Sequence, residues 1–137
     1  MGLMRTIYMS RPHPARRNLN WLGDSVGRWV GNPLVVDTVG FNDKTWLNDA
    51  GAQHSDALHL VEQIRPILGG RYLEYKVTAE DPKVLAKPYT YTRYYEKLTL
   101  TSWKMSARSE QRRYSRHELS FGIFPKNEEP YLVESCL

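Results

Sequence analysis

Hydrophobic and polar residues alternate along several short segments in the middle of the chain, and a period of two predicts β-strands. Residues 34–39 (Leu-Val-Val-Asp-Thr-Val) follow a β-prone run at 28–30, with the turn Gly31-Asn32-Pro33 between them, which predicts a hairpin. Residues 71–79 alternate most regularly, and 88–98 form a further strand rich in Tyr and Thr. Strands at such short intervals, separated by turn residues, predict an antiparallel meander that is curled or closed into a barrel.

Residues 57–65 alternate only partly and are expected to form another strand. Leu58, Leu60, Glu62 and Ile64 then share one face, so a carboxylate lies among apolar groups and needs a partner. Arg93, Lys76 or a nearby His could be that partner, and a salt bridge at the edge of the core is the structural alternative to a functional role. Between the strands, 41–53 is expected to be a long loop, and such loops are often functional.

The two ends of the chain differ from this middle. Alternating prolines in Arg11-Pro12-His13-Pro14 exclude regular helix, so residues 1–20 are expected to form an extended arm and 21–137 a single β-rich domain. Residues 103–118 show no clean period, while 119–124 and 131–133 are expected to be short strands.

Composition indicates the cellular compartment and the partners of the protein but not its reaction. The chain of 137 residues has nine Tyr, four Trp and a single cysteine, Cys136, which excludes an internal disulfide and favours a reducing, cytoplasmic compartment. It has no apolar run long enough to span a membrane and no export signal, so no membrane partner is expected. The net charge is +4, but no nucleic-acid-binding module accompanies it, so no nucleic-acid partner is expected either. Exposed edges of an antiparallel sheet favour pairing with a second copy, which makes a homodimer one expectation.

Residues 5–95 resemble a family of small, mostly bacterial proteins with fungal relatives, for which no defining activity is known. The resemblance rests on these motifs: Arg11-Pro12-His13-Pro14, Gly23-Asp24-Ser25-Val26-Gly27-Arg28-Trp29, Leu34-Val35-Val36-Asp37-Thr38, Gly40-Phe41-Asn42-Asp43-Lys44-Thr45-Trp46-Leu47, His54-Ser55, Ala57-Leu58-His59, Glu62 and Asp81-Pro82-Lys83. The basic segment 106–116 departs from the acidic ending of the relatives. A small barrel with an aromatic pocket is also similar to lipocalin-like scaffolds and to nuclear-transport-factor-like scaffolds. The expected fold is therefore mainly β, a lipocalin-like or open barrel with a small pocket, and an α+β cone is the alternative.

Four polar residues are the candidates for catalysis: His59, Asp37, His54 and Glu62. Histidine is well suited to proton transfer near neutral pH. His54 and His59 lie on opposite faces of any single strand, so they converge only if His54 lies in the preceding loop; otherwise one is a surface His and the other a satisfied core His. Asp37 shares a face with Val35 and Val39, and an inward orientation, slightly favoured, would raise its pKa and make it an acid or base.

Aromatic residues provide the candidate walls of a binding site: Trp29, Phe41, Trp46, Tyr75, Tyr89 and Tyr91. The same residues could equally form the core. No metal-ligand spacing and no cofactor motif is recognised, so no metal and no cofactor are expected. The sequence therefore predicts a cofactor-free enzyme that rearranges a small hydrophobic molecule, an isomerase, dehydratase or cyclase (including pericyclic, Diels–Alder-type closure) of specialised metabolism. A non-catalytic ligand-binding or interaction module is the alternative.

Overall fold

Nine strands form almost all of the regular structure among the residues that the structure describes. In this computed structural model the described residues are 3–16, 18–48, 50–97, 102–105, 118–120 and 131–135, with side chains described for 5–16, 18–48 and 50–97. A short 3-10 turn, η1 (Leu68–Gly70), joins two of the strands. The strands are β1 (Leu3–Met9), β2 (Asp24–Trp29), β3 (Leu34–Val39), β4 (His59–Ile67), β5 (Tyr72–Glu80), β6 (Tyr89–Lys97), β7 (Ser102–Met105), β8 (Glu118–Ser120) and β9 (Tyr131–Ser135).

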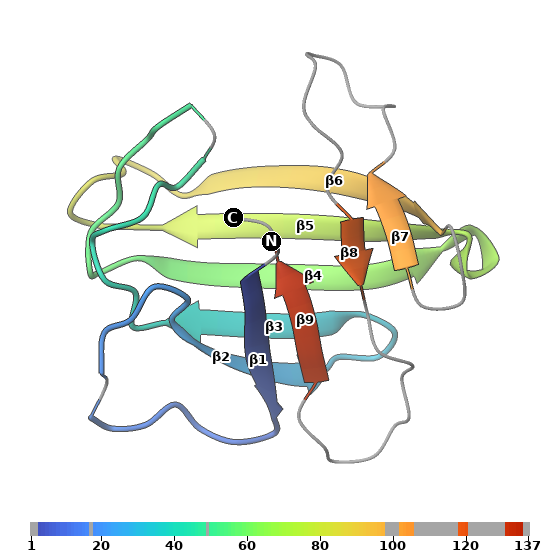
Figure 1. Cartoon of the computed structure of the whole chain (residues 1–137), viewed down its shortest axis with the longest axis horizontal. Helices are drawn as coiled ribbons and strands as arrows, with labels where there is room; N and C mark the ends of the chain where they lie inside the picture. The colour runs from blue at the N-terminus through green and yellow to red at the C-terminus, as the bar shows by residue number, and fades with distance from the viewer. Residues whose placement is uncertain are drawn as a thin grey trace.

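All nine strands belong to one curled sheet with the order β8-β7-β6-β5-β4-β3-β2-β1-β9. From β2 to β8 each strand pairs antiparallel with the next, whereas β1 pairs parallel with β2 and antiparallel with β9. Figure 1 shows β1, β9, β8 and β7, from the two ends of the chain, crossing in front of strands β3 to β6. Strands β8 and β9 are neighbours in space, but no ladder joins their described residues, so the barrel is open.

The concave face of the sheet holds the core. On β3, Leu34, Val36 and Thr38 are buried while the residues between them are only partly buried, as the period of two requires. Ile7 of β1 packs in the same apolar cluster as Leu73 of β5, which lies four strands away in the sheet. Only a strongly curled sheet brings such strands together. A second cluster at the other end consists of Phe41, Leu58, Leu60, Val77 and Ala79.

An ion pair crosses this interior. Arg5 of β1 donates to both carboxylate oxygens of Glu62 on β4 at 2.6 Å, and the Tyr75 hydroxyl also donates to Glu62. Arg5 and Glu62 are 7% and 2% exposed. Because β2 and β3 lie between β1 and β4 in the sheet, this contact ties two parts of the curled sheet together across the core.

Gly27 permits the close approach of β1 to β2. A Cβ built on Gly27 would lie 2.8 Å from Ile7 Cγ2 and 2.8 Å from Met9 Sδ. Gly27→Ala is therefore expected to lower the free energy of unfolding by about 1–3 kcal/mol through overpacking, as measured by urea denaturation. A variant as stable as the original chain would contradict this packing.

The mainly β fold and its open, curled barrel are confirmed, and the described residues contain no α-helix that an α+β cone would need. The hairpin of β2 and β3 and the strand 131–133 are also found. The predicted arm differs at Leu3–Met9, which is β1: the prolines restrict the backbone only from Pro12 onward. Period analysis missed β7, and the predicted strand 119–124 is a strand only at Glu118–Ser120 within the described residues. Cys136 and the basic segment 106–116 lie outside the described residues.

Candidate functional site

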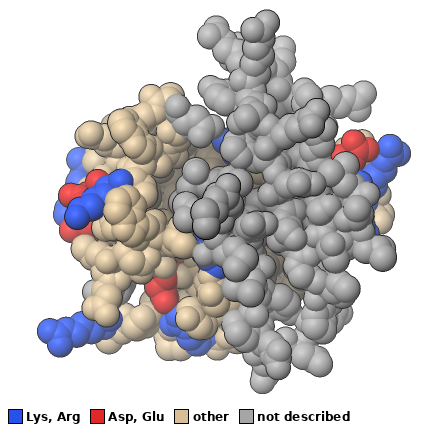
Figure 2. All heavy atoms as spheres, in the orientation of Figure 1, with Lys and Arg blue, Asp and Glu red and all other residues tan. Residues whose placement is uncertain are grey.

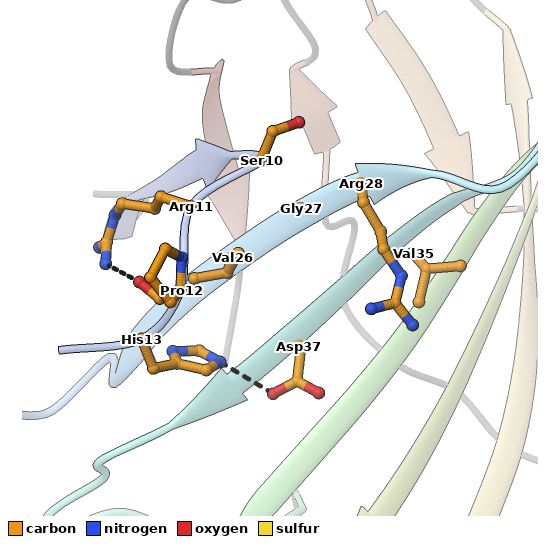
Figure 3. Close-up of a pocket in the computed structure, with 9 residues that line it drawn as sticks. All are labelled: Ser10, Arg11, Pro12, His13, Val26, Gly27, Arg28, Val35 and Asp37. Carbon is orange, nitrogen blue, oxygen red and sulfur yellow. Dashed lines mark hydrogen bonds and ion pairs between the residues drawn. The ribbon is translucent and has the colours of Figure 1, made fainter. Parts of the chain in front are cut away.

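The segment after β1 folds onto the convex face of the sheet and brings His13 to strands β2 and β3. Ser10, with φ 54°, turns the chain, and its amide donates to the Gly27 carbonyl at 3.0 Å. Arg11 then packs over the Tyr8 ring, with 4.0 Å from the guanidinium carbon to the ring centroid. Figure 3 shows His13 reaching from this segment towards Asp37 on β3.

His13 is the centre of a chain of charged groups. Its Nδ1 lies 2.7 Å from an Asp24 oxygen, and its Nε2 lies 3.0 Å from Asp37 Oδ1. At one end Arg11 donates to the other oxygen of Asp24 at 2.6 Å. At the other end His59 Nε2 lies 3.1 Å from Asp37 Oδ2, and His59 Nδ1 lies 3.6 Å from Glu80. The chain therefore alternates basic and acidic groups across the arm and strands β2 to β5.

Strand register explains how Asp37 and His59 meet. Asp37 pairs directly with Val61, so His59 is two residues along β4 from the partner of Asp37 and lies on the same face. Diagonal neighbours of this kind are within reach of long side chains. Because each imidazole nitrogen of His13 faces a carboxylate, only the protonated ring can donate to both at once. In its protonated form the ring can therefore bridge Asp24 and Asp37.

This arrangement lowers the pKa values of the Asp24 and Asp37 carboxyl groups. Burial alone would raise the pKa of Asp37, but hydrogen bonds from His59 and His13 and the charge of both rings outweigh burial, so this pKa is lowered. Burial would also raise the pKa of Asp24, yet contacts with Arg11 and His13 lower it. Both groups therefore stay ionised near neutral pH.

A lowered carboxyl pKa stabilises the folded state above the pKa of the unfolded chain, about 4. We expect the free energy of unfolding to fall as pH drops from about 4 through the lower folded-state pKa values of Asp24 and Asp37. Urea denaturation at a series of pH values measures this fall. In Asp24→Asn and Asp37→Asn the fall should be smaller than in the original chain. If both variants showed the same fall as the original chain, these carboxyls would not contribute.

A cavity of about 250 Å³ lies between the arm and the sheet. It is below the range of about 300–1,000 Å³ that drug-sized ligands occupy, so its ligand is small. Pro12, Val26 and Val35 give it apolar walls, while Arg11, His13, Arg28 and Asp37 supply charge. Figure 3 shows Arg28, Val35 and Asp37 rising from neighbouring strands on the same side as His13. We call this the arm pocket.

The expected inward orientation of Asp37 is wrong. Its side chain is 44% exposed on the convex face, because Leu34, Val36 and Thr38 take the concave positions of β3. The expected rise in its pKa is accordingly a lowering.

The other candidate catalytic residues do not all join Asp37. His59 does, as described. His54 lies in the loop before β4, where it is buried, contacts Thr45 Oγ1 at 2.5 Å and lies 3.0 Å from the Ser55 carbonyl through Nδ1. Both of its nitrogens are thus satisfied locally. Glu62 lies on the concave face as predicted, but its partners are Arg5 and Tyr75 rather than Arg93, Lys76 or a His.

The predicted aromatic walls are dispersed. Phe41 is buried in the second core cluster, and Tyr75 and Tyr91 pack partly buried against it. Trp46, by contrast, is 61% exposed in a loop. Trp29 and Tyr89 are likewise exposed, and none of the six residues lines the arm pocket.

The sequence interpretation did not single out His13 or Arg28 as site residues. His13 was visible only as part of a proline-rich arm, and its position over β2 depends on the turn at Ser10. A usable signal existed: Asp24 and Asp37 occupy equivalent faces of a hairpin and need a cationic partner.

Comparison with protein-family models, with curated proteins and with solved structures found no match.

Within the described residues, no three or more His, Cys, Asp or Glu side chains are arranged to hold a metal ion. The described part of the chain also has no helix long and apolar enough to cross a membrane. Figure 2 shows Lys and Arg beside Asp and Glu at the margins of the face it draws. Ion pairs among the described residues include Arg65–Glu74 and Lys83–Asp56.

Proposed function

We propose that the protein is a cofactor-free enzyme that moves a proton next to a carbonyl group of a small, largely apolar molecule bound in the arm pocket. The observation that carries the proposal is the His13–Asp37 contact of 3.0 Å at the wall of that cavity. An acid and a base side by side can act on neighbouring atoms of one substrate. Isomerisation, dehydration and ring closure through an enol all share this step.

Each group has a definite role in the proposal. Asp37 takes the proton from the carbon next to the carbonyl, while the His13 imidazolium gives its Nε2 proton to the carbonyl oxygen, which leaves a neutral enol. A carboxylate of lowered pKa is a weak base, so the transfer needs the negative charge on oxygen to be neutralised at the same time. His13 lies where it can do so. His59 positions Asp37 through the second carboxylate oxygen.

The Asp24 carboxylate supports His13. It accepts from Nδ1 at 2.7 Å and so fixes the ring orientation that points Nε2 towards the pocket. Arg11 in turn holds Asp24. This resembles the general arrangement in which a buried or half-buried carboxylate orients a catalytic imidazole.

Exchange of carbon-bound hydrogen for deuterium tests the proposal. The protein is incubated in D₂O with 4-phenyl-2-butanone or 2-oxo-4-phenylbutanoate, and loss of the proton signal next to the carbonyl is followed by NMR. We expect the original chain to exchange this hydrogen faster than buffer alone does. His13→Gln should exchange it about 10²–10⁴ times more slowly than the original chain. Arg16→Gln, an exposed arm residue outside the pocket, is the control and should exchange at the original rate.

One observation favours the second candidate, a non-catalytic binding module. Both His13 nitrogens already have carboxylate partners, so a purely structural role would satisfy the ring. A compound that binds the arm pocket but exchanges at the rate of buffer alone would support the module and contradict the enzyme.

A further inference from the structure

Arg28 is the cation of the arm pocket that has no carboxylate partner among the described residues. It lies on the convex face of β2, is exposed, and lines the cavity. Arg11, the other arginine of the pocket, is held by Asp24 at 2.6 Å and by the Pro12 carbonyl at 2.9 Å. Within the described chain Arg28 makes neither a hydrogen bond nor an ion pair. Its guanidinium is therefore free to bind a ligand.

We propose that Arg28 makes the arm pocket selective for a small monocarboxylate, whose carboxyl group it binds while the adjacent carbonyl faces His13 and Asp37. Only the placement of the carbonyl beside His13 and Asp37 rests on the proposed function, whereas binding of the carboxyl group by Arg28 does not. A guanidinium presents two parallel donors that match a carboxylate. In the β2–β3 register Arg28 lies opposite Val35, and Asp37 lies two residues further along β3. The two charged groups therefore flank the same patch of sheet.

The balance of charge in the pocket favours a monoanion. Among the described residues that line the pocket, Arg11 is paired with Asp24 and His13 with Asp37, which leaves Arg28 as the one cation without a carboxylate. A phosphate dianion would place an unmatched negative charge near the exposed Asp37 carboxylate. The apolar walls Pro12, Val26 and Val35 suit a hydrocarbon body. A 2-oxo acid with an apolar side chain meets both conditions.

Two compounds that differ mainly in the carboxyl group test this selectivity. 2-Oxo-4-phenylbutanoate carries a carboxylate where 4-phenyl-2-butanone carries a methyl group. Binding is followed by the backbone amide shifts of Val26–Arg28 in ¹⁵N-labelled protein. We expect the acid to bind the original chain at least about tenfold more tightly, the scale of a charged hydrogen bond, and inorganic phosphate at the same concentration not to displace it.

Variants of Arg28 provide the decisive comparison. Arg28→Gln should lose the preference for the acid, Arg28→Lys should keep part of it, and the control Arg16→Gln should keep all of it. Equal binding of acid and ketone by the original chain, displacement of the acid by phosphate, or a preference that survives in Arg28→Gln would overturn the inference.

The proposed function is judged separately by deuterium exchange of the ketone, which has no carboxylate for Arg28. Ketone exchange together with no acid preference would overturn the Arg28 inference alone. An acid preference without any exchange would contradict the enzyme and leave the carboxylate site standing.

Discussion

Replacing Glu62 by Ala is expected to lower the free energy of unfolding by about 3–5 kcal/mol, the usual cost of leaving a buried charge without its partner. Arg5 is only 7% exposed, and its Nε is buried without a hydrogen-bond partner among the described residues. Burial lowers the pKa of Arg5, but the charge of Glu62, its hydrogen bond with Arg5 and the nearby Tyr75 and Tyr91 together outweigh burial and hold this pKa above its ordinary value. Loss of that carboxylate removes the compensation.

The same carboxylate also matters for Tyr75. Burial, followed by the charge of Glu62, raises the pKa of Tyr75 well above its ordinary value, so the hydroxyl stays protonated and donates to Glu62. In Glu62→Ala this donor would face Arg5 without an acceptor between them.

Two further variants identify the cause of the destabilisation. Glu74→Ala removes a carboxylate that pairs with the half-exposed Arg65 on the convex face, and should cost about 0–1 kcal/mol. The double variant Arg5→Met, Glu62→Leu removes both charges and should recover most of the stability, because apolar residues of similar size often replace a buried pair without loss. Urea denaturation of all three measures these differences. Equal costs for Glu62→Ala and Glu74→Ala would show that the interior pair contributes little.

The second large effect is expected from Asp37→Asn, which should slow deuterium exchange of 2-oxo-4-phenylbutanoate by about 10²–10⁴. The amide cannot take up the substrate proton, although its oxygen can still accept from His13 while its NH₂ group faces His59 Nε2. Asp37→Asn also removes the stabilisation that the lowered pKa of Asp37 gives at neutral pH, but this cost should be modest because the side chain is 44% exposed. Binding of the acid should persist, because Arg28 is unaltered.

That separation of rate from affinity distinguishes a catalytic Asp37 from a structural one. If Asp37 only fastened the arm, Asp37→Asn would weaken binding and rate together. Asp56→Asn, in an exposed pair with Lys83 far along the chain from the pocket residues, is the matched control and should leave both unchanged.

Alternation in the sequence predicted strands β3 to β6 to within about two residues, but it placed the Asp37 side chain on the wrong face, and the distribution of apolar residues explains both results. Leu58, Leu60 and Ile64 placed Glu62 on the concave face because three apolar neighbours mark one side of a strand. Asp37 shares its face with Val35 and Val39 while Val36 lies on the opposite face, so both faces of the strand carry valine and periodicity alone could not decide which one is buried. The burial of Thr38, which its hydrogen bond with Ser25 allows, decides the orientation instead.

Long-range partners were beyond local pattern analysis. Arg5 and Glu62 are 57 positions apart, and their contact depends on how far the sheet curls. His13 reaches Asp37 across 24 positions through a turn that an isolated Ser10 does not predict. The site therefore contains Asp37 and His59 from the predicted set, together with His13 and Arg28, which only the folded arm brings to them.

The most direct test of the central claim, that chemistry takes place in the arm pocket, is to locate the bound ligand by NMR. Protein with ¹³C-labelled valine methyl groups is mixed with 2-oxo-4-phenylbutanoate, and nuclear Overhauser contacts to the ligand are recorded. Val26 and Val35 line the arm pocket, whereas Val36 and Val77 are buried on the concave face. We predict contacts from the ligand to Val26 and Val35. Contacts to Val36 and Val77 instead would place the ligand inside the barrel and contradict the account.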